Sequence, residues 1–279
     1  MKKLARRLLR PRPSHHSVAY EDVREERHVF VFGVWGRSST TALQRILNST
    51  RAICIWGEPG QFLVDNLVEA HHQILHRLDA ERSSDRVRAV SESFRRDDFS
   101  IETAMARADW QSSLTQVRQA LLDLLAPPIP SRRLGFKEIR VRSPLTFRAL
   151  RELFPNCAFV FLFRDPLAQW PSVQTKKGWP EAEDIELFAA QVETLGGWYL
   201  EQEGFFLEDT DLRDRGAVER LCVHLGLPGF QLGLLGDGVS AAPNKRPLAQ
   251  ADADFLRARL GDLYARLQAR SRTCLSAPT

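Results

Sequence analysis

The chain has 279 residues, of which 43% are hydrophobic and 27% charged, a composition that indicates a globular protein with enough apolar residues for a buried core. Its net charge of +4 is mild and spread along the chain, so it favours an anionic small ligand over a nucleic acid. No run of about 18 apolar residues occurs, which excludes an ordinary transmembrane helix. Residues 1–17 lack the continuous apolar segment of a signal peptide, so we expect a soluble, cytoplasmic protein.

The N-terminus carries the one local concentration of charge. Six basic residues interleave with leucines there: Lys2, Lys3, Arg6, Arg7, Arg10 and Arg12. Because tails of this type usually stay unfolded, we predict that residues 1–27 form a flexible leader in solvent. A transient contact with acidic lipid or with a partner is the alternative. Residues 28–270 are predicted to form a single α/β domain, and residues 271–279 a tail.

Strand-like and helical segments alternate along this domain. A run of β-branched and aromatic residues at 28–33 predicts a buried strand, apolar residues at helical spacing predict a helix over 40–49, and residues 52–56 predict a second strand. Three further strand-like segments follow: 133–139, 157–163 and 204–208. Helical patterns occupy six more places: 61–78, 101–125, 143–154, 181–202, 215–225 and 250–269.

The alternation predicts the fold class. Strands that alternate with helices form a mostly parallel sheet, here of about five strands, with helices on both faces in a three-layer αβα arrangement. The helices between the second and third strands form an insertion into this α/β core. Within that insertion, residues 79–100 are polar enough to be a mobile segment or lid.

Residues 31–47, VFGVWGRSSTTALQRIL, run from the first strand through a turn into the first helix. Backbone N–H groups from Gly36 onward would face an anion at the start of this helix, where the helix dipole also favours negative charge. Four consecutive hydroxyl side chains add donors: Ser38, Ser39, Thr40 and Thr41. A nucleoside triphosphatase needs a Lys directly before the last hydroxyl residue of such a loop. Here the cation is Arg37, ahead of all four, which argues against a triphosphatase or kinase.

The loop GVWGRSSTTAL resembles the 5′-phosphosulfate-binding loop of sulfotransferases that use 3′-phosphoadenosine 5′-phosphosulfate (PAPS), with Ser39 where the family pattern has Gly. A second segment, FVFLFRDPLAQWPSV, resembles the family's 3′-phosphate-binding motif, in which Arg164 and Ser172 clamp the 3′-phosphate. An Arg at the end of a strand and a Ser in the following turn or helix can converge on one dianion. Three weaker resemblances lie in the family's order: ICIWGEPGQFL, FKEIRV and FFLEDTDLRDRGAVERLCVHLGLPGF.

This resemblance implies a carbohydrate-type or bacterial sulfotransferase with a fold like that of the P-loop nucleotide hydrolases. PAPS would be the sulfuryl donor and 3′-phosphoadenosine 5′-phosphate (PAP) the product, with no metal. Arg37 would bind the sulfate and the bridging oxygen, supported by Gly36 and the four hydroxyl residues. The acceptor would be a hydroxyl of a carbohydrate or of another small molecule.

A general base must take the proton of the acceptor's hydroxyl group. Glu58, at the end of the second strand, is our candidate, because the resembling carboxylate serves this role in several sulfotransferases. Glu58 could instead cap the next helix or pair with Lys137. His71 and His72 are rival bases, although we interpret them as packing or surface residues of their helix.

Further basic residues extend the expected site. Lys137 or Arg140 could reach the transferred sulfate or an acidic acceptor, and strand alternation places these two on opposite faces. Lys245 and Arg246 resemble the basic segment that covers the nucleotide in cytosolic relatives. Two other hypotheses stay open: a P-loop small-molecule kinase, which predicts magnesium-dependent binding of ATP, and an inactive sulfotransferase fold that only binds a nucleotide or a partner.

Overall fold

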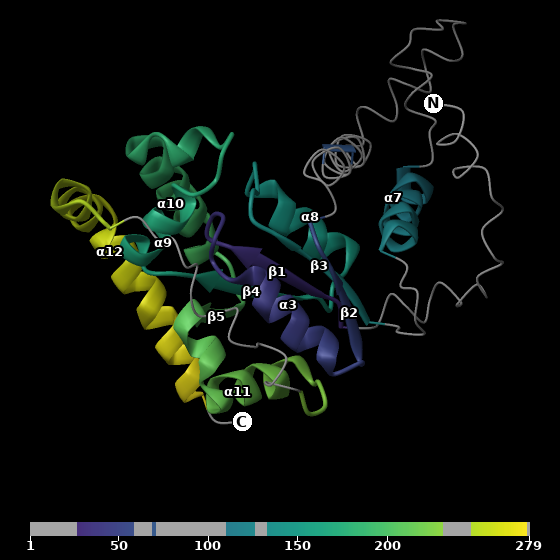
Figure 1. Ribbon diagram of the computed structural model, residues 1–279. Coiled ribbons are helices and arrows are strands. Elements are labelled where there is room, and N and C mark those ends of the chain that lie inside the picture. Colours follow the sequence, from purple (N-terminus) through teal and green to yellow (C-terminus); the bar gives the residue numbers. More distant parts are fainter. Residues whose placement is uncertain (1–26, 59–68, 71–109, 126–132, 231–246, 278–279) are drawn as a thin grey trace, which may run out of the picture.

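Five strands form one sheet at the centre of the protein in the computed structural model, which describes residues 27–58, 69–70, 110–125, 133–230 and 247–277 (Figure 1). In chain order the strands are β1 (Val29–Gly33), β2 (Ile53–Trp56), β3 (Arg133–Glu138), β4 (Ala158–Phe163) and β5 (Phe205–Glu208). Their order across the sheet is β2-β3-β1-β4-β5, and every adjacent pair is parallel. The predicted mostly parallel sheet of about five strands is confirmed.

The strand order places the loop after β1 at the middle of one edge of the sheet. β1 is the central strand and pairs with β3 on one side and β4 on the other. β2 follows β1 in the chain but pairs with β3, which lies between them. Because all strands are parallel, the segments that follow their carboxyl ends gather at the same edge, which is where α/β proteins bind ligands.

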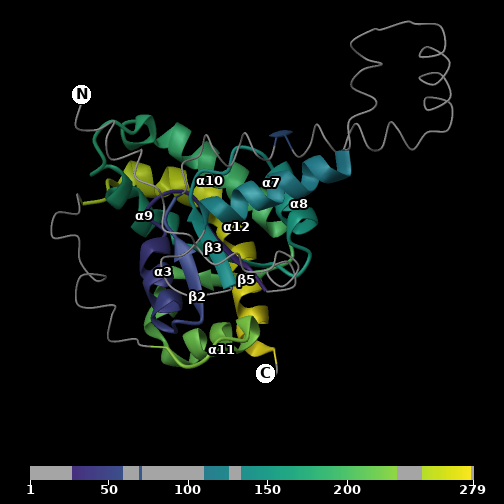
Figure 2. The ribbon, with the colours of Figure 1, turned by 90° about the vertical axis from the view of Figure 1, so that its right-hand side faces the viewer.

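Helices connect the strands and cover both faces of the sheet. The α-helices are α3 (Thr40–Ser49), α7 (Trp110–Leu124), α8 (Leu145–Leu153), α9 (Pro166–Val173), α10 (Ile185–Leu200), α11 (Arg215–Leu225) and α12 (Gln250–Ser276). Two short 3₁₀ helices are η1 (Pro180–Ala182) and η2 (Asp209–Arg213). α7 belongs to the predicted insertion between β2 and β3, and it lies beside the β2–β3 edge of the sheet (Figure 2). The indole Nε1 of Trp56 donates to the carbonyl of Leu125, which ties the end of this segment to β2.

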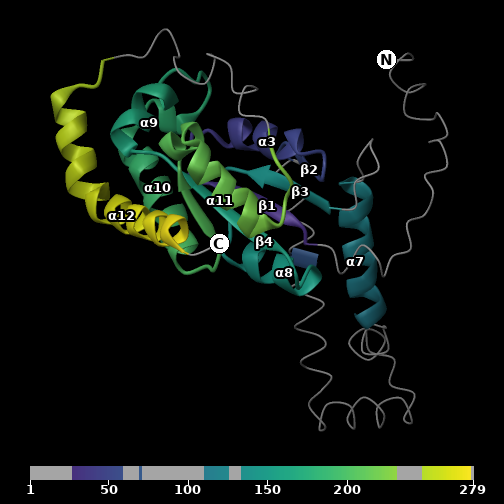
Figure 3. The same cartoon turned by 90° about the horizontal axis from the view of Figure 1, so that it is seen from below.

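The two faces of the sheet have different side chains, because residues alternate along each strand. Phenylalanines fill one face, where they pack against α7, α8, α10 and α12; Phe32, for example, contacts Phe136, Phe147 and Phe161. Aliphatic residues fill the other face, where Val31 and Val160 pack with α3 and α11. α3 and α8 accordingly lie on opposite sides of the sheet (Figure 3). The period-two pattern of β1 and β4 thus builds two cores.

Some helix boundaries differ from the sequence expectation. The helix predicted over 181–202 is two elements, because the side chain of Asp184 accepts from the N–H groups of Glu186 and Leu187 and starts α10 anew after η1. The last helix, predicted to end at 269, continues to Ser276. Its buried residues recur at helical spacing up to Leu267 and Ser271, so packing against the domain supports the extra turns.

Several expected features fall on residues that the structure does not describe. The basic leader, the polar segment 79–100 and most of the helix predicted over 61–78 lie outside the described residues. The division into leader, domain and tail therefore stays a prediction. Among the described residues, no helix is both long enough and apolar enough to cross a membrane.

Substitution of Gly135 tests the tight contact between β1 and β3, and substitution of Gly197 is the control. A Cβ atom added at Gly135 would lie 1.7 Å from the carbonyl oxygen of Val29, whereas one at Gly197 in α10 would meet nothing within 4 Å. We expect Gly135→Ala to lower the free energy of unfolding by about 3 kcal/mol or more, because backbone must move. Gly197→Ala should raise it by about 0.5–1 kcal/mol through helix propensity. Urea unfolding of both variants measures this, and equal effects would contradict the close approach of the two strands.

Candidate functional site

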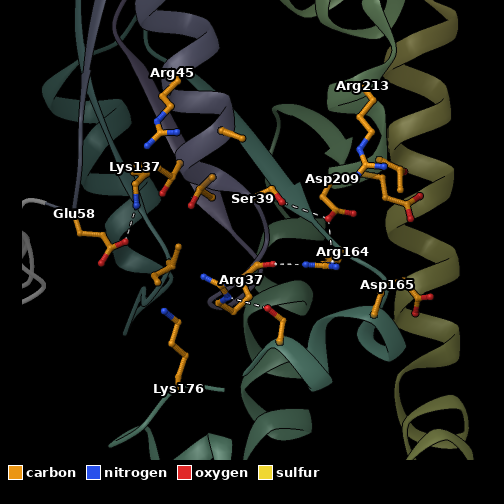
Figure 4. Close-up of a pocket in the computed structure, with 18 of the residues that line it drawn as sticks. Arg37, Ser39, Arg45, Glu58, Lys137, Arg164, Asp165, Lys176, Asp209 and Arg213 are labelled. Atoms are coloured by element: carbon orange, nitrogen blue, oxygen red, sulfur yellow. Dashed lines mark hydrogen bonds and ion pairs between the residues drawn. The ribbon is translucent and has the colours of Figure 1, made fainter. Parts of the chain in front are cut away.

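A cavity of about 630 Å³ opens at the carboxyl edge of the sheet (Figure 4). It is lined by residues from the loop after β1, the start of α3, the segments after β2, β3, β4 and β5, and the end of α9. Ionisable side chains dominate its wall: Arg37, Arg45, Glu58, Lys137, Arg164, Asp165, Lys176, Glu208, Asp209, Arg213 and Tyr264. Such a wall suits an anionic, polar ligand better than an apolar one.

The loop after β1 has an unusual backbone. Trp35, Arg37 and Ser39 have φ angles of 64°, 70° and 65°, in the left-handed region that residues other than glycine rarely adopt. Gly36 and Ser38, which lie between them, do not have positive φ. Left-handed residues that alternate with residues of negative φ are the backbone pattern of a nest, by which P-loops bind phosphate groups, and we refer to residues 35–39 as the nest. This backbone pattern suits an anionic ligand.

Interior hydrogen bonds hold this conformation. Gln169 of α9 is fully buried, and its Nε2 donates to the carbonyls of Val34 and Gly36 at 3.0 and 2.7 Å. Because the C=O and N–H of one peptide point in opposite directions, the inward carbonyl of Gly36 turns the N–H of Arg37 to the other side. The Ser38 hydroxyl donates to the carbonyl of Trp35 at 3.0 Å. Ser38 is buried and outside the cavity lining, so it supports the loop from within.

The two predicted phosphate-binding motifs meet in this cavity. The Nε of Arg37 donates to the hydroxyl of Ser172 at 2.9 Å, and Nη1 of Arg164 donates to the carbonyl of Arg37 at 3.3 Å. Ser172 is the seventh residue of α9, which Asp165 caps by accepting from the N–H of Leu167. Two helical turns thus bring Ser172 back beside the loop after β1. Arg37, Arg164 and Ser172 can act on one bound molecule.

Asp209 is a site residue that the sequence reasoning did not single out. Its Oδ2 lies 3.3 Å from Nε of Arg164 and 3.4 Å from the hydroxyl of Ser39, which donates to it. Burial raises the pKa of Asp209, and the neighbouring Arg164 opposes that rise. Two signals in the sequence could have indicated it: Asp209 directly follows a strand, at the edge where the other site residues lie, and it falls in the family-like segment FFLEDTDL.

Glu58 and Lys137 form an ion pair on the opposite side of the cavity (Figure 4). Nζ of Lys137 lies 2.7 Å from Oε1 of Glu58, and the side chains are 8% and 43% exposed. The lysine is held at the end of β3, whereas the carboxylate reaches into solvent. Arg140, which alternation placed on the other face, stacks over the rings of Trp179 at 4.5 Å and Trp35 at 5.5 Å and does not line the cavity.

The remaining predicted residues divide into three groups. Thr40 and Thr41 line the cavity at the start of α3. Gly36 lies beneath the ring of Trp179, where an added Cβ would come within 2.5 Å of ring carbons, so only glycine fits there without movement. Four residues lie outside the described residues: His71, His72, Lys245 and Arg246.

Sequence reasoning also missed three cations of the wall: Arg45, Lys176 and, in η2, Arg213. Arg45 follows Thr41 by one helical turn on the same face of α3, a spacing that could have indicated it. Lys176 follows the end of α9 by three residues and has no comparable signal. Within the described part of the chain, no group of three or more metal-ligating side chains could hold a metal ion.

Ser39 tests whether the nest is maintained in solution. A left-handed residue other than glycine costs about 1–2 kcal/mol, and glycine adds about 0.5–1 kcal/mol of unfolded-state entropy. Ser39→Gly should therefore raise the free energy of unfolding by about 0.5 kcal/mol, while the β-branched Ser39→Val should lower it by about 1 kcal/mol or more. Thermal or urea unfolding gives both values. If the valine variant is as stable as the glycine variant, Ser39 does not keep this backbone angle.

Comparisons with known proteins give a family match and several similar solved structures. The "Sulfotransferase family" matches residues 28–206. Similar solved structures include the sulfotransferase domain from the curacin biosynthetic pathway, at 14% identity over 85% of this chain and 98% of that chain, with a TM-score of 0.44. A sulfotransferase from Alicyclobacillus acidocaldarius is similar at 16% identity over 88% of this chain and 96% of that chain, with a TM-score of 0.47. Sulfotransferase STF9 from Mycobacterium avium is similar at 14% identity, 88% and 78% coverage and a TM-score of 0.45. No curated protein sequence matches significantly. Since the family match spans more than half of its residues, the chain belongs to the sulfotransferase family.

Proposed function

We propose that the protein transfers the sulfuryl group of PAPS to a hydroxyl of a carbohydrate or other small-molecule acceptor by in-line displacement. The observation that carries this proposal is the anion-binding nest at Trp35–Ser39, joined through Arg37 to Ser172 and Arg164 in one cavity. A nest and a separate Arg–Ser pair suit a ligand with two anionic groups. PAPS has that form, with a phosphosulfate at one end of the ribose and a phosphate on its 3′ oxygen.

The residues of the cavity fit these two groups. The nest and the Arg37 guanidinium would bind the phosphosulfate, with Thr40 and Thr41 as further donors at the helix start. Arg164 and Ser172 would bind the 3′-phosphate by charge-assisted hydrogen bonds. Asp209 stands against Arg164, so the carboxylate must give up part of this contact when a phosphate binds. The ion pair keeps Arg164 positioned until then.

Glu58 and Lys137 would carry the chemical step on the other side of the phosphosulfate. The acceptor oxygen forms a bond to sulfur as the bond from sulfur to the bridging phosphate oxygen breaks, and Glu58 takes the hydroxyl proton. Negative charge gathers on the departing phosphate, where the nest N–H groups and Arg37 stabilise it. Lys137 holds Glu58 in place through the 2.7 Å ion pair and can donate to a sulfate oxygen.

The family assignment favours this function over the kinase hypothesis. The loop after β1 also lacks the lysine that a P-loop kinase uses. The inactive fold is the remaining alternative. It would keep the nest and the Arg–Ser pair but would transfer nothing. Nucleotide binding distinguishes a kinase from a sulfotransferase fold, whether active or inactive. Transfer of the sulfuryl group distinguishes an active sulfotransferase from an inactive one.

Calorimetry with PAP and ADP tests the donor site. PAP should bind tighter than ADP, which lacks the 3′-phosphate. Arg164→Gln should weaken the binding of PAP about ten- to a hundredfold, because one or two hydrogen bonds to a charged group are lost. The same variant should change the affinity for ADP less than about twofold. Arg215→Gln, at an exposed arginine of α11, is the matched control. Equal binding of PAP and ADP, or binding of ATP only with magnesium, would refute the assignment of Arg164 and Ser172.

Transfer from labelled PAPS to a panel of hydroxyl compounds tests Glu58. Glu58→Gln keeps the shape of the side chain but removes its ability to take a proton, so transfer should slow about 10²- to 10⁴-fold while PAP affinity is unchanged. Glu219→Gln, at an exposed position of α11, controls for a loss of surface charge. An active wild type with a fully active Glu58→Gln variant would show that another group is the base.

A further inference from the structure

The charges of the cavity wall divide into two unlike sides (Figure 4). The side of Arg164 has two cations against three carboxylates: Arg164 and Arg213, with Asp165, Glu208 and Asp209. The side of Glu58 has three cations against that one carboxylate: Arg45, Lys137 and Lys176. The excess positive charge therefore lies on the side of the proposed base, away from the proposed 3′-phosphate site.

Two of these three cations have no ion-pair partner within the described residues. Lys137 is engaged by Glu58 at 2.7 Å, but neither Arg45 nor Lys176 takes part in a salt bridge there. Arg45 projects from the exposed face of α3, and Lys176 follows α9 on the far side of the cavity. Figure 4 shows both side chains on the Glu58 side. Each of the two presents a positive charge to this side of the cavity, where a bound anion would lower its energy.

The proposed donor does not account for this pair. In the proposed function, the nest and Arg37 bind its phosphosulfate, and Arg164 and Ser172 bind its 3′-phosphate. Lys137 can serve the transferred sulfate. Arg45 and Lys176 are then left facing the space from which an acceptor must approach Glu58.

The same space has a flat apolar surface. Trp179 and Ile139 line it, and the indole of Trp179 has the Arg140 guanidinium over one face and Gly36 against Cη2 and Cζ3 of its six-membered ring. A sugar or aromatic ring can lie on such an indole while its polar substituents reach charged groups at the rim. Arg45 also borders a second, more open groove along α3, of about 580 Å³, which leaves room for an acceptor larger than one ring.

We propose that the acceptor carries an acidic group, a carboxylate, phosphate or sulfate, in addition to the hydroxyl that is sulfated, and that Arg45 or Lys176 binds this group. The inference rests on the proposed function. It assigns the ring of the acceptor to Trp179, its hydroxyl to Glu58 and its acidic group to one of these two cations. Neutral sugars and alcohols are then poor acceptors.

Binding of matched probes to the PAP-saturated protein tests the proposal at constant ionic strength, because salt screens such contacts. The pairs are glucuronate with glucose, glucose 6-phosphate with glucose, and 4-hydroxyphenylacetate with its amide. At least one acidic member should bind about tenfold tighter than its neutral counterpart. Arg45→Gln combined with Lys176→Gln should reduce that preference to less than about twofold, whereas Lys177→Gln, at the exposed neighbour outside the cavity lining, should leave it intact.

The outcomes separate the inference from the function on which it rests. If wild type binds PAP but no acidic probe is preferred over its neutral counterpart, the inference is wrong and the donor site stands. If the double variant loses affinity for PAP, the two cations belong to the donor, which also overturns it. Failure of the wild type to bind PAP removes the proposed function itself. The probe pairs further show whether a carboxylate or a phosphate is preferred.

Discussion

The site depends on the hydrogen bonds that one buried amide makes to the loop after β1. Three left-handed residues other than glycine cost about 1–3 kcal/mol each, so the loop would not keep this shape without support. Gln169 supplies that support by donating from Nε2 to the carbonyls of Val34 and Gly36. Its own amide orientation is fixed by these two acceptors, since its oxygen could not bond to either. Because Gln169 lies in α9 between Arg164 and Ser172, the residues of both motifs share one rigid unit.

Electrostatics then decides what the rigid unit can bind. Asp209 places a carboxylate beside Arg164, and burial raises the pKa of Asp209 above its value in the unfolded chain. A group whose pKa is raised on folding destabilises the fold increasingly as pH rises through the folded pKa, so ionised Asp209 costs stability at neutral pH. The carboxylate keeps Arg164 in place at that cost. In the proposed function, the 3′-phosphate of PAPS, with a larger charge, replaces this carboxylate at Arg164.

Much of the fold could be predicted from the sequence, because buried parallel strands and amphipathic helices leave local patterns. The five strands, the turn into α3 and the relation of Arg164 to Ser172 are all local in the chain. The insertion of β3 between β1 and β2 is not local, since it depends on which strands pair. Asp209 and Lys176 were missed for the same reason: each reaches the cavity only through the packing of distant elements. Ser38 was predicted to donate to the ligand, but its hydroxyl faces the interior and donates to the carbonyl of Trp35. A motif in the sequence does not tell which way each of its side chains points.

Ser39 shows which forces set the geometry of the loop. Its hydroxyl donates to Asp209 at 3.4 Å, near the limit of a hydrogen bond, so this contact contributes little. The contact is too weak to offset the cost of about 1–2 kcal/mol for a left-handed serine. The angle is therefore imposed by its neighbours: the Gln169 bonds before it, and α3 after it, whose first turn is closed by the N–H groups of Ala42 and Leu43 donating to the carbonyl of Ser39. A glycine is the easier residue at this position, but the nest does not require one, and a serine there is compatible with an intact anion site.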